Sequence, residues 1–188
     1  MSRKKSKRKH SMVEIIGLAA IGLFVVGIIW LAFFTQPQTP SQTQTNTQTQ
    51  TDARAPDFTL TDVDGNAFRL SDHQGKIVVL EFMRTTCEAC VAENPHLRDL
   101  RSKFGGDVVM VMVSVDPAGD TDSVLRDYRN QNMMGWIAIG DKARVYQRYS
   151  VQATPTIFII DKNGYIKYQH VGLTESSILI GEVAILTE

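Results

Sequence analysis

Residues 81–90 read Glu81-Phe82-Met83-Arg84-Thr85-Thr86-Cys87-Glu88-Ala89-Cys90, an apolar stretch that runs into a turn and a pair of cysteines. The 188-residue sequence contains no other cysteine. Two cysteines at this spacing close a small disulfide ring, bind a metal ion or are incidental, so the surrounding sequence must decide. A closed zinc site needs about four nitrogen or sulfur ligands, and the chain has no second cysteine pair. The pattern therefore favours a redox pair over zinc.

The sequence around the pair alternates between apolar strands and helices. Residues 76–82 and 108–115 are continuous apolar runs, typical of strands buried on both faces of a sheet. Between them, apolar residues recur at helical spacing as far as Phe104, and Gly105-Gly106 follows as a stop signal. A second helix is predicted from Thr121, its cap, to Asn132. This alternation predicts an α/β fold whose core strands are joined by right-handed crossovers.

Further elements are predicted before and after this core. The sequence indicates a short hairpin over 58–70, a strand over 136–139, a helix over 141–149 capped by Asp141, an antiparallel hairpin over 156–168, and a terminal helix over 174–186.

The N-terminus predicts a membrane anchor. Residues 1–12 form a basic leader, and residues 13–34 are apolar with Glu14 as their one charge. A helix of this length spans roughly 33 Å, enough for a bilayer core. A basic leader stays in the cytoplasm, so we expect a single-pass protein with its C-terminal domain outside. A cleaved signal peptide is the alternative, but its apolar region is usually shorter and is followed by a small-residue cleavage site.

A polar tether and one globular domain complete the predicted organisation. Residues 35–54 are rich in Thr and Gln and cannot bury enough apolar surface to fold, so we expect a disordered tether before a domain over 55–188. Six of the 20 basic residues and one of the 20 acidic residues precede Thr35, which leaves 14 basic and 19 acidic residues for the rest. This acidic balance argues against nucleic acid as a partner.

Several motifs taken in order resemble the thioredoxin-fold family, and within it the membrane-anchored TlpA/ResA-like thiol-disulfide oxidoreductases. The resemblance runs from Ala55 to the C-terminus. It implies a thioredoxin-like fold: a mixed central sheet flanked by helices, with an N-terminal β-hairpin. The motifs are Ala55-Pro56-Asp57-Phe58-Thr59-Leu60, the strand and turn before Cys87-x-x-Cys90, Ser114-Val115-Asp116, Ala153-Thr154-Pro155-Thr156, and Asp161-Lys162-Asn163-Gly164.

The two cysteines have different expected roles. Cys87 falls at a helix N-terminus, where free backbone N–H groups and the helix dipole favour a thiolate. We therefore expect Cys87 to be the attacking nucleophile and Cys90, one turn later, to be the resolving thiol. A purely structural disulfide is the alternative, although so short a loop removes little entropy from the unfolded chain. We expect no cofactor beyond this redox-active disulfide, and no metal.

Glu81 interrupts an otherwise apolar strand six residues before Cys87. Burial there should raise the pKa of its carboxyl group. The resemblance implies that this acid moves the proton of the second thiol. The alternative is that Glu81 faces outward or pairs with Arg84.

Thr154 and Pro155 acquire a role through the resemblance. It implies a cis peptide bond before Pro155, which packs opposite the cysteines, and it implies that the backbone of Thr154 is offered to a partner protein. An ordinary trans proline at the start of a strand is the alternative.

The resemblance implies a reaction and its partners. The protein would exchange disulfides with cysteines of extracytoplasmic proteins, as a reductant regenerated by a membrane redox relay, with apocytochrome c thiols as one candidate substrate. Many relatives have Trp before the first cysteine and Pro before the second, where this chain has Thr86 and Ala89. Glu88 would also disfavour a neighbouring thiolate. These departures leave the direction of electron flow open.

Two other functions use the same fold. Sco-like copper chaperones have a membrane anchor, two cysteines one position further apart and a distant histidine, for which His170 is the candidate here. A histidine on a terminal strand is more often an ordinary core or surface residue. Peroxiredoxins share the Ala55–Phe58 opening but need a threonine three residues before their cysteine, where this chain has Arg84.

Overall fold

The computed structural model describes residues 49–50 and 52–188. The predicted leader (1–12), the predicted anchor (13–34) and most of the predicted tether lie outside the described residues. Within the described part of the chain, no helix has both the length and the apolar character needed to cross a bilayer. The anchor therefore stays a prediction from the sequence.

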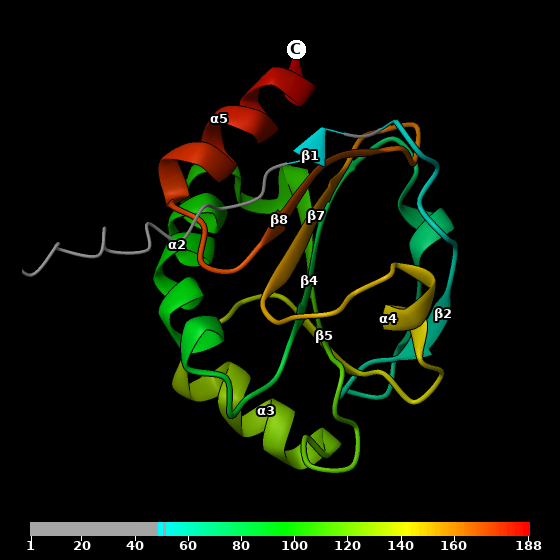
Figure 1. The fold of residues 1–188 in the computed structure, drawn as a ribbon, viewed down its shortest axis with the longest axis vertical. Helices are drawn as coiled ribbons and strands as arrows, with labels where there is room; N and C mark the ends of the chain where they lie inside the picture. Colours follow the sequence, from blue (N-terminus) through cyan, green and yellow to red (C-terminus); the bar gives the residue numbers. More distant parts are fainter. Residues whose placement is uncertain (1–48, 51) are drawn as a thin grey trace, which may run out of the picture. The chain divides into compact units, whose positions relative to one another are not determined.

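Six strands form the central sheet, with the spatial order β1-β8-β7-β4-β5-β6 (Figure 1). The strands are β1 (Thr49–Gln50), β4 (Ile77–Met83), β5 (Val108–Ser114), β6 (Ile137–Gly140), β7 (Thr156–Ile160) and β8 (Ile166–Val171). β4, β5 and β6 are parallel, whereas β7 is antiparallel to β4 and to β8. The sheet is mixed, as predicted.

The sheet centre is built from the continuous apolar runs that the sequence displays. All seven residues of β4 are buried, and β5 has a single half-buried residue among its seven. β4 lies between β5 and β7, so Glu81 is in register with Met112 on one side and Ile157 on the other. Strands covered on both faces lose the alternation of apolar and polar residues, which is why these runs are continuous.

Helices cover both faces of the sheet (Figure 1). α2 (Glu88–Phe104), α3 (Asp122–Gln131) and α5 (Ser176–Thr187) lie on one side, and the short α4 (Val145–Arg148) lies on the other with a separate hairpin. One buried cluster includes Cys90, Leu97, Leu125 and Leu179 from the three long helices. The other includes Phe58, Phe68, Val145 and Tyr149.

The hairpin predicted over residues 58–70 is confirmed, and it lies on the same side of the sheet as α4. β2 (Thr59–Thr61) pairs antiparallel with β3 (Ala67–Arg69). In the turn, the Asp62 carboxylate accepts the backbone N–H groups of Asp64 and Asn66 at 2.9 and 2.8 Å, and Gly65 has a φ of 90°. Two 3₁₀ segments, η1 (Leu70–His73) and η2 (Gly105–Asp107), complete the described elements.

The predicted helix over 141–149 is wrong in length, because α4 begins at Val145. The Asp141 carboxylate accepts the N–H groups of both Val145 and Tyr146 at 2.8 Å. Arg144, directly before Val145, adopts the left-handed conformation, with a φ of 53°. The Asp141 side chain thus bridges a tight turn to the start of α4, and no helix begins directly after Asp141.

The domain was predicted to start at Ala55, but residues before Ala55 already belong to the sheet. β1 pairs with Tyr168 and Gln169 of β8. The N–H of Ile166 donates to the carbonyl of Ala53 at 2.8 Å. These bonds involve only the backbone, so the Thr- and Gln-rich composition gave no sign of them.

Candidate active site

The cysteine pair lies where the chain leaves β4 and enters α2. Cys87 is the N-cap residue of α2, with extended backbone angles, and its Sγ accepts the backbone N–H of Cys90 at 3.2 Å. The two sulfur atoms form a disulfide. Cys87 is half-buried, whereas Cys90 is 0% exposed. This difference in exposure suits an attacking Cys87 and a sheltered Cys90.

Thr154 and Pro155 lie against the pair. The Sγ of Cys87 is 3.4 Å from the backbone oxygen of Thr154. The peptide bond between Thr154 and Pro155 is cis, as the resemblance implied. Pro155 is buried, and its carbonyl accepts the N–H of Gly172 at 2.9 Å. The structure thus brings the two residues predicted for substrate binding together with the reactive sulfur.

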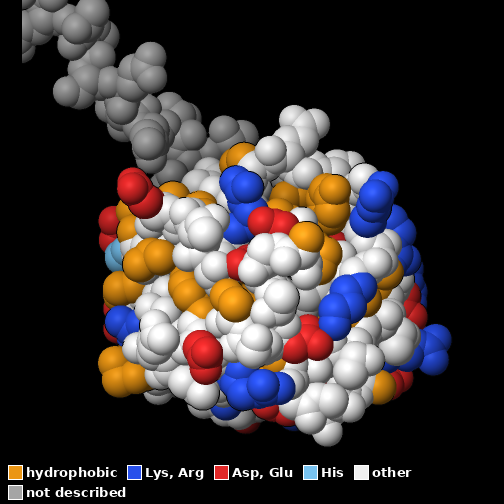
Figure 2. All heavy atoms as spheres, turned by 90° about the horizontal axis from the view of Figure 1, so that it is seen from below, with side chains coloured by type: hydrophobic (Ala, Val, Ile, Leu, Met, Phe, Trp, Pro, Cys, Tyr) orange, Lys and Arg blue, Asp and Glu red, His pale blue; other side chains and the backbone are white. Residues whose placement is uncertain are grey.

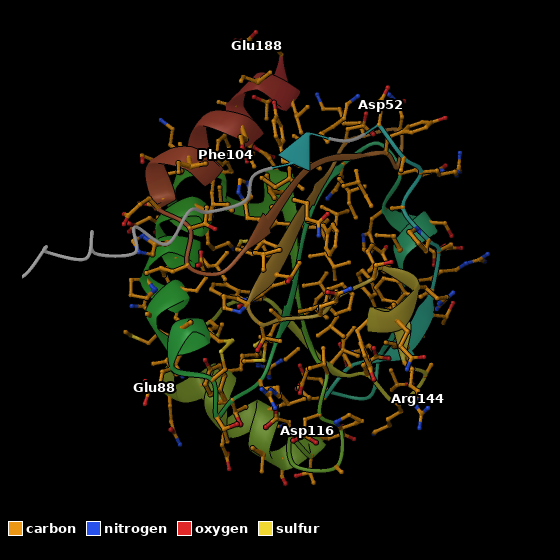
Figure 3. All side chains as sticks on the ribbon, in the orientation of Figure 1. Asp52, Glu88, Phe104, Asp116, Arg144 and Glu188 are labelled. Atoms are coloured by element: carbon orange, nitrogen blue, oxygen red, sulfur yellow. A yellow bond between two sulfur atoms is a disulfide. The ribbon has the colours of Figure 1, made fainter. Side chains whose placement is uncertain are left out.

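The surface at this end of the molecule is mixed in character. Glu88 and Asp116 mark the start of α2 and the loop after β5 at one end of the sheet (Figure 3). Figure 2 views that end, where hydrophobic side chains are interspersed with separate acidic and basic groups. Arg84 and Glu88 are both exposed on either side of Cys87. No single sign of charge dominates this face.

Glu81 is buried beneath the pair. It is 2% exposed and lies in register with Met112 and Ile157, which pack in one cluster with Cys90. Neither carboxyl oxygen has a hydrogen-bond partner among the described residues, so the alternatives of an outward-facing or Arg84-paired Glu81 do not match its placement. Burial, with a smaller contribution from the charge of Glu93, raises its pKa to about 8.

Glu93 is a second buried carboxyl group, which the sequence analysis missed. One oxygen accepts the backbone N–H of Thr174 at 2.7 Å, and the other has no partner among the described residues. Burial raises the pKa of Glu93 to about 7, helped by the charge of Glu175 and opposed by the Thr174 hydrogen bond. Its helical spacing from Cys90 and Leu97, both apolar and buried, was the available signal.

Asn94 and Tyr128 connect α2 to α3 beside these acids. The Asn94 side-chain amide donates to the Tyr128 hydroxyl at 2.9 Å. Burial raises the pKa of Tyr128, and the charges of Glu81 and Asp120 raise it further. The phenol therefore stays protonated near neutral pH and offers a hydrogen-bond donor in a region rich in carboxyl groups.

His170 does not occupy a ligand position. Its Nε2 lies 2.7 Å from Oε2 of Glu182, and both residues are buried between β8 and α5. Across residues 49–50 and 52–188, no three histidine, cysteine or acidic side chains gather in a way that would hold a metal ion. The imidazole that a copper chaperone would need is instead in contact with the Glu182 carboxyl group.

Comparisons with known proteins agree with this geometry. The AhpC/TSA family model matches residues 51–169. The thiol-disulfide oxidoreductase ResA of Geobacillus kaustophilus is 32% identical over 166 residues, which cover 87% of each chain. This chain belongs to the ResA-like thiol-disulfide oxidoreductases. The thioredoxin-like protein YneN of Bacillus subtilis is 30% identical over 63% of this chain and 70% of its own.

Solved structures place these ResA-like features on a thioredoxin-like fold. A thiol:disulfide interchange protein, DsbE, from Chlorobium tepidum is 29% identical, with a TM-score of 0.61 over 72% of this chain and 95% of its own. The chain is therefore an oxidoreductase that acts on thiols and disulfides of other proteins. Cys87 and Cys90 are the described residues equipped for that reaction.

Proposed function

We propose that the protein is a membrane-tethered thiol-disulfide reductant whose domain works outside the cytoplasm. The observation that carries the reaction is the contrast between a half-buried Cys87, capping α2 beside Thr154, and a fully buried Cys90. The apolar residues 13–34 and the basic leader support the tether and its orientation. An oxidising compartment is where such exchange is needed.

Reduction of a partner proceeds in two exchanges. The Cys87 thiolate attacks one sulfur of the partner's disulfide, a mixed disulfide forms, and the other partner sulfur leaves as a thiolate. The Cys90 thiolate then attacks Cys87, which releases the second partner sulfur and closes the Cys87–Cys90 disulfide. Two electrons pass to the partner, and a membrane redox relay then supplies two further electrons that reduce the Cys87–Cys90 disulfide. Cysteine pairs of apocytochrome c are one candidate substrate, suggested by the resemblance.

Glu81 supplies the proton step. Cys90 is buried and must lose its proton before it attacks Cys87. A carboxyl group whose pKa is about 8 exchanges protons near neutral pH. Met112 and Ile157, which are in register with Glu81, pack in one cluster with Cys90. Glu81 therefore lies on the same side of the sheet as Cys90. We therefore assign Glu81 as the proton acceptor for Cys90.

Substrate trapping tests this function. In Cys90→Ala the second exchange is impossible, so mixed disulfides through Cys87 should accumulate in membranes and dissolve on treatment with a small thiol. The matched control is Cys87→Ala/Cys90→Ala, which should trap nothing. A folded Cys90→Ala protein that forms no covalent complexes, or wild-type protein that consumes peroxide faster than it exchanges disulfides, would contradict the proposal.

A further inference from the structure

Asp120 carries a buried carboxylate in the loop that follows β5. The residue is 3% exposed. One oxygen accepts the Ser114 hydroxyl at 2.6 Å and the backbone N–H of Thr85 at 3.0 Å, and the other accepts the Thr85 hydroxyl. All three donors are neutral. Removing a carboxylate from water is costly unless its acceptors are well satisfied, so these three bonds account for how the charge is tolerated.

Two of the three bonds hold the loop that delivers Cys87. Thr85 lies within the turn in which the Cys87 N–H donates to the Arg84 carbonyl at 3.2 Å. The start of this loop is fixed by the bond from the Val115 N–H to the Met83 carbonyl at 3.0 Å. The loop thus begins at Met83, which is bonded to Val115, and ends at Cys87, the cap of α2. Asp120 holds Thr85, in the middle of this loop.

Capping of α3 does not explain Asp120. The cap residue of α3 is Thr121, whose hydroxyl accepts the N–H of Val124 at 3.4 Å. The Asp120 carboxylate is instead bonded to Thr85 and Ser114, across the end of the sheet. The start of α2 and the loop after β5 lie at that same end, marked by Glu88 and Asp116 (Figure 3).

We propose that Asp120 is a positioning residue for Cys87 and that it acts through Thr85. By fixing the turn, it keeps the Cys87 sulfur at the N-terminus of α2, where it receives the Cys90 N–H at 3.2 Å. The same donor and the helix dipole stabilise the thiolate of the reduced protein. The inference rests on the proposed role of Cys87 as the nucleophile.

The test measures alkylation of Cys87 by iodoacetamide against pH, in reduced Cys90→Ala protein. Thr85→Val keeps the side-chain shape but removes the hydroxyl donor. We expect the pKa of Cys87 to rise and alkylation below that pKa to fall about three- to tenfold. Thr85→Ser, which keeps the donor, should restore the parent profile. If Thr85→Val folds poorly, Thr85→Ala takes its place: it removes the same hydroxyl without adding a methyl group there, and it should show the same rise in the Cys87 pKa.

Ser114→Ala is the matched control, because it removes a donor from the Asp120 carboxylate and leaves the loop with Thr85 and Cys87 unchanged. Its profile should stay within about twofold of the parent. A folded Thr85→Val protein with the parent profile would overturn the inference, as would equal shifts in Thr85→Val and Ser114→Ala. Failure of the proposed function looks different: Cys87 of the parent would then show no lowered pKa and would trap no partner.

Discussion

Glu81 and Glu93 place two carboxyl groups on the side of the sheet that α2, α3 and α5 cover, close enough that the charge of Glu93 raises the pKa of Glu81. Three of their four oxygens lack hydrogen-bond partners among the described residues. Such groups are costly when ionised, and carboxyl groups with strongly shifted pKa values concentrate at functional sites. The pair is therefore better explained by proton transfer than by stability.

Replacement of Glu81 by Gln should slow disulfide exchange without unfolding the domain. Gln keeps the shape but accepts no proton, and loss of a positioned base typically costs on the order of 100-fold in rate. Stopped-flow reduction of a model disulfide between pH 6 and 9 measures the effect. Wild-type rates should rise through the pKa of Glu81, about 8, and the variant should lose this rise. Identical profiles would reject the role.

The same replacement has a predictable effect on stability. Folding raises the Glu81 pKa from 4.5 to about 8, so its protonated form is favoured in the folded state. The associated stability is present below pH 4.5 and is lost as the pH rises through 8. Denaturant titrations should show Glu81→Gln gaining on wild type by up to about 4 kcal/mol between pH 5 and 9. Glu93→Gln, the control, removes a charge that raises the folded-state pKa of Glu81 and should lower the pH at which this gain levels off.

The residues of the site differ in how far the sequence reveals them. Cys87 and Glu81 stand out because each breaks its local pattern. Glu93 does not, since it stands beside Asn94 on a predicted helix, where an acid is ordinarily solvated. Its burial depends on Thr174, 81 residues away in the sequence. Helical spacing from Cys90 and Leu97 indicates that Glu93 lies on the buried face of the helix, but nothing local in the sequence indicates the contact with Thr174.

At the scale of elements, strands were predicted best where tertiary burial coincides with a continuous apolar run. β4 and β5 each match their predicted spans within a residue. β1 was missed because backbone pairing with the edge of β8 places no demand on side chains. The start of α4 was misplaced because one Asp141 carboxylate satisfies two N–H groups four and five residues later. Hydrophobic patterns in the sequence thus predict which segments are buried, but they do not predict hydrogen bonds made by the backbone.

A buried hydrogen bond between His170 and Glu182 joins β8 to α5 and yields a prediction. His170 and Glu182 are 2.7 Å apart with almost no exposure. His170→Leu removes a hydrogen-bond partner of the buried Glu182 carboxyl group, so we expect the free energy of unfolding to fall by about 2 kcal/mol. His170→Leu/Glu182→Leu, which removes both polar groups, should recover most of that loss. Urea titrations measure both variants.

That experiment also separates structure from copper binding. If His170 were a metal ligand, His170→Leu would weaken Cu(I) binding by the reduced domain while leaving its stability nearly unchanged. A stable variant with reduced copper affinity would contradict the structural role assigned here. The double variant serves as the control, because it keeps the cysteines and their surroundings.

For the whole molecule, the site lies at one end of a sheet that is buried on both faces (Figure 1). The carboxyl ends of the parallel strands β4 and β5 lead to Cys87 and Asp120, and the start of antiparallel β7 adds Pro155. The loop before β7 therefore meets the Cys87 sulfur at Thr154, and the loop after β5 meets the Cys87 loop at Thr85. The proposed membrane anchor, which lies outside the described residues, would decide which side of the membrane this sulfur faces.

The topology of the full-length chain is the last prediction. In spheroplasts that produce reduced Cys90→Ala protein, a membrane-impermeant maleimide should label Cys87 to the same extent before and after permeabilisation. We expect this result because a basic leader before a first apolar span ordinarily stays in the cytoplasm, and the chain that follows crosses the membrane. Cys87→Ala/Cys90→Ala, which has no thiol, is the labelling control. A chain without residues 1–34 should stay inside and be labelled only after permeabilisation. If the full-length protein behaved like that truncated chain, the proposed orientation would be wrong.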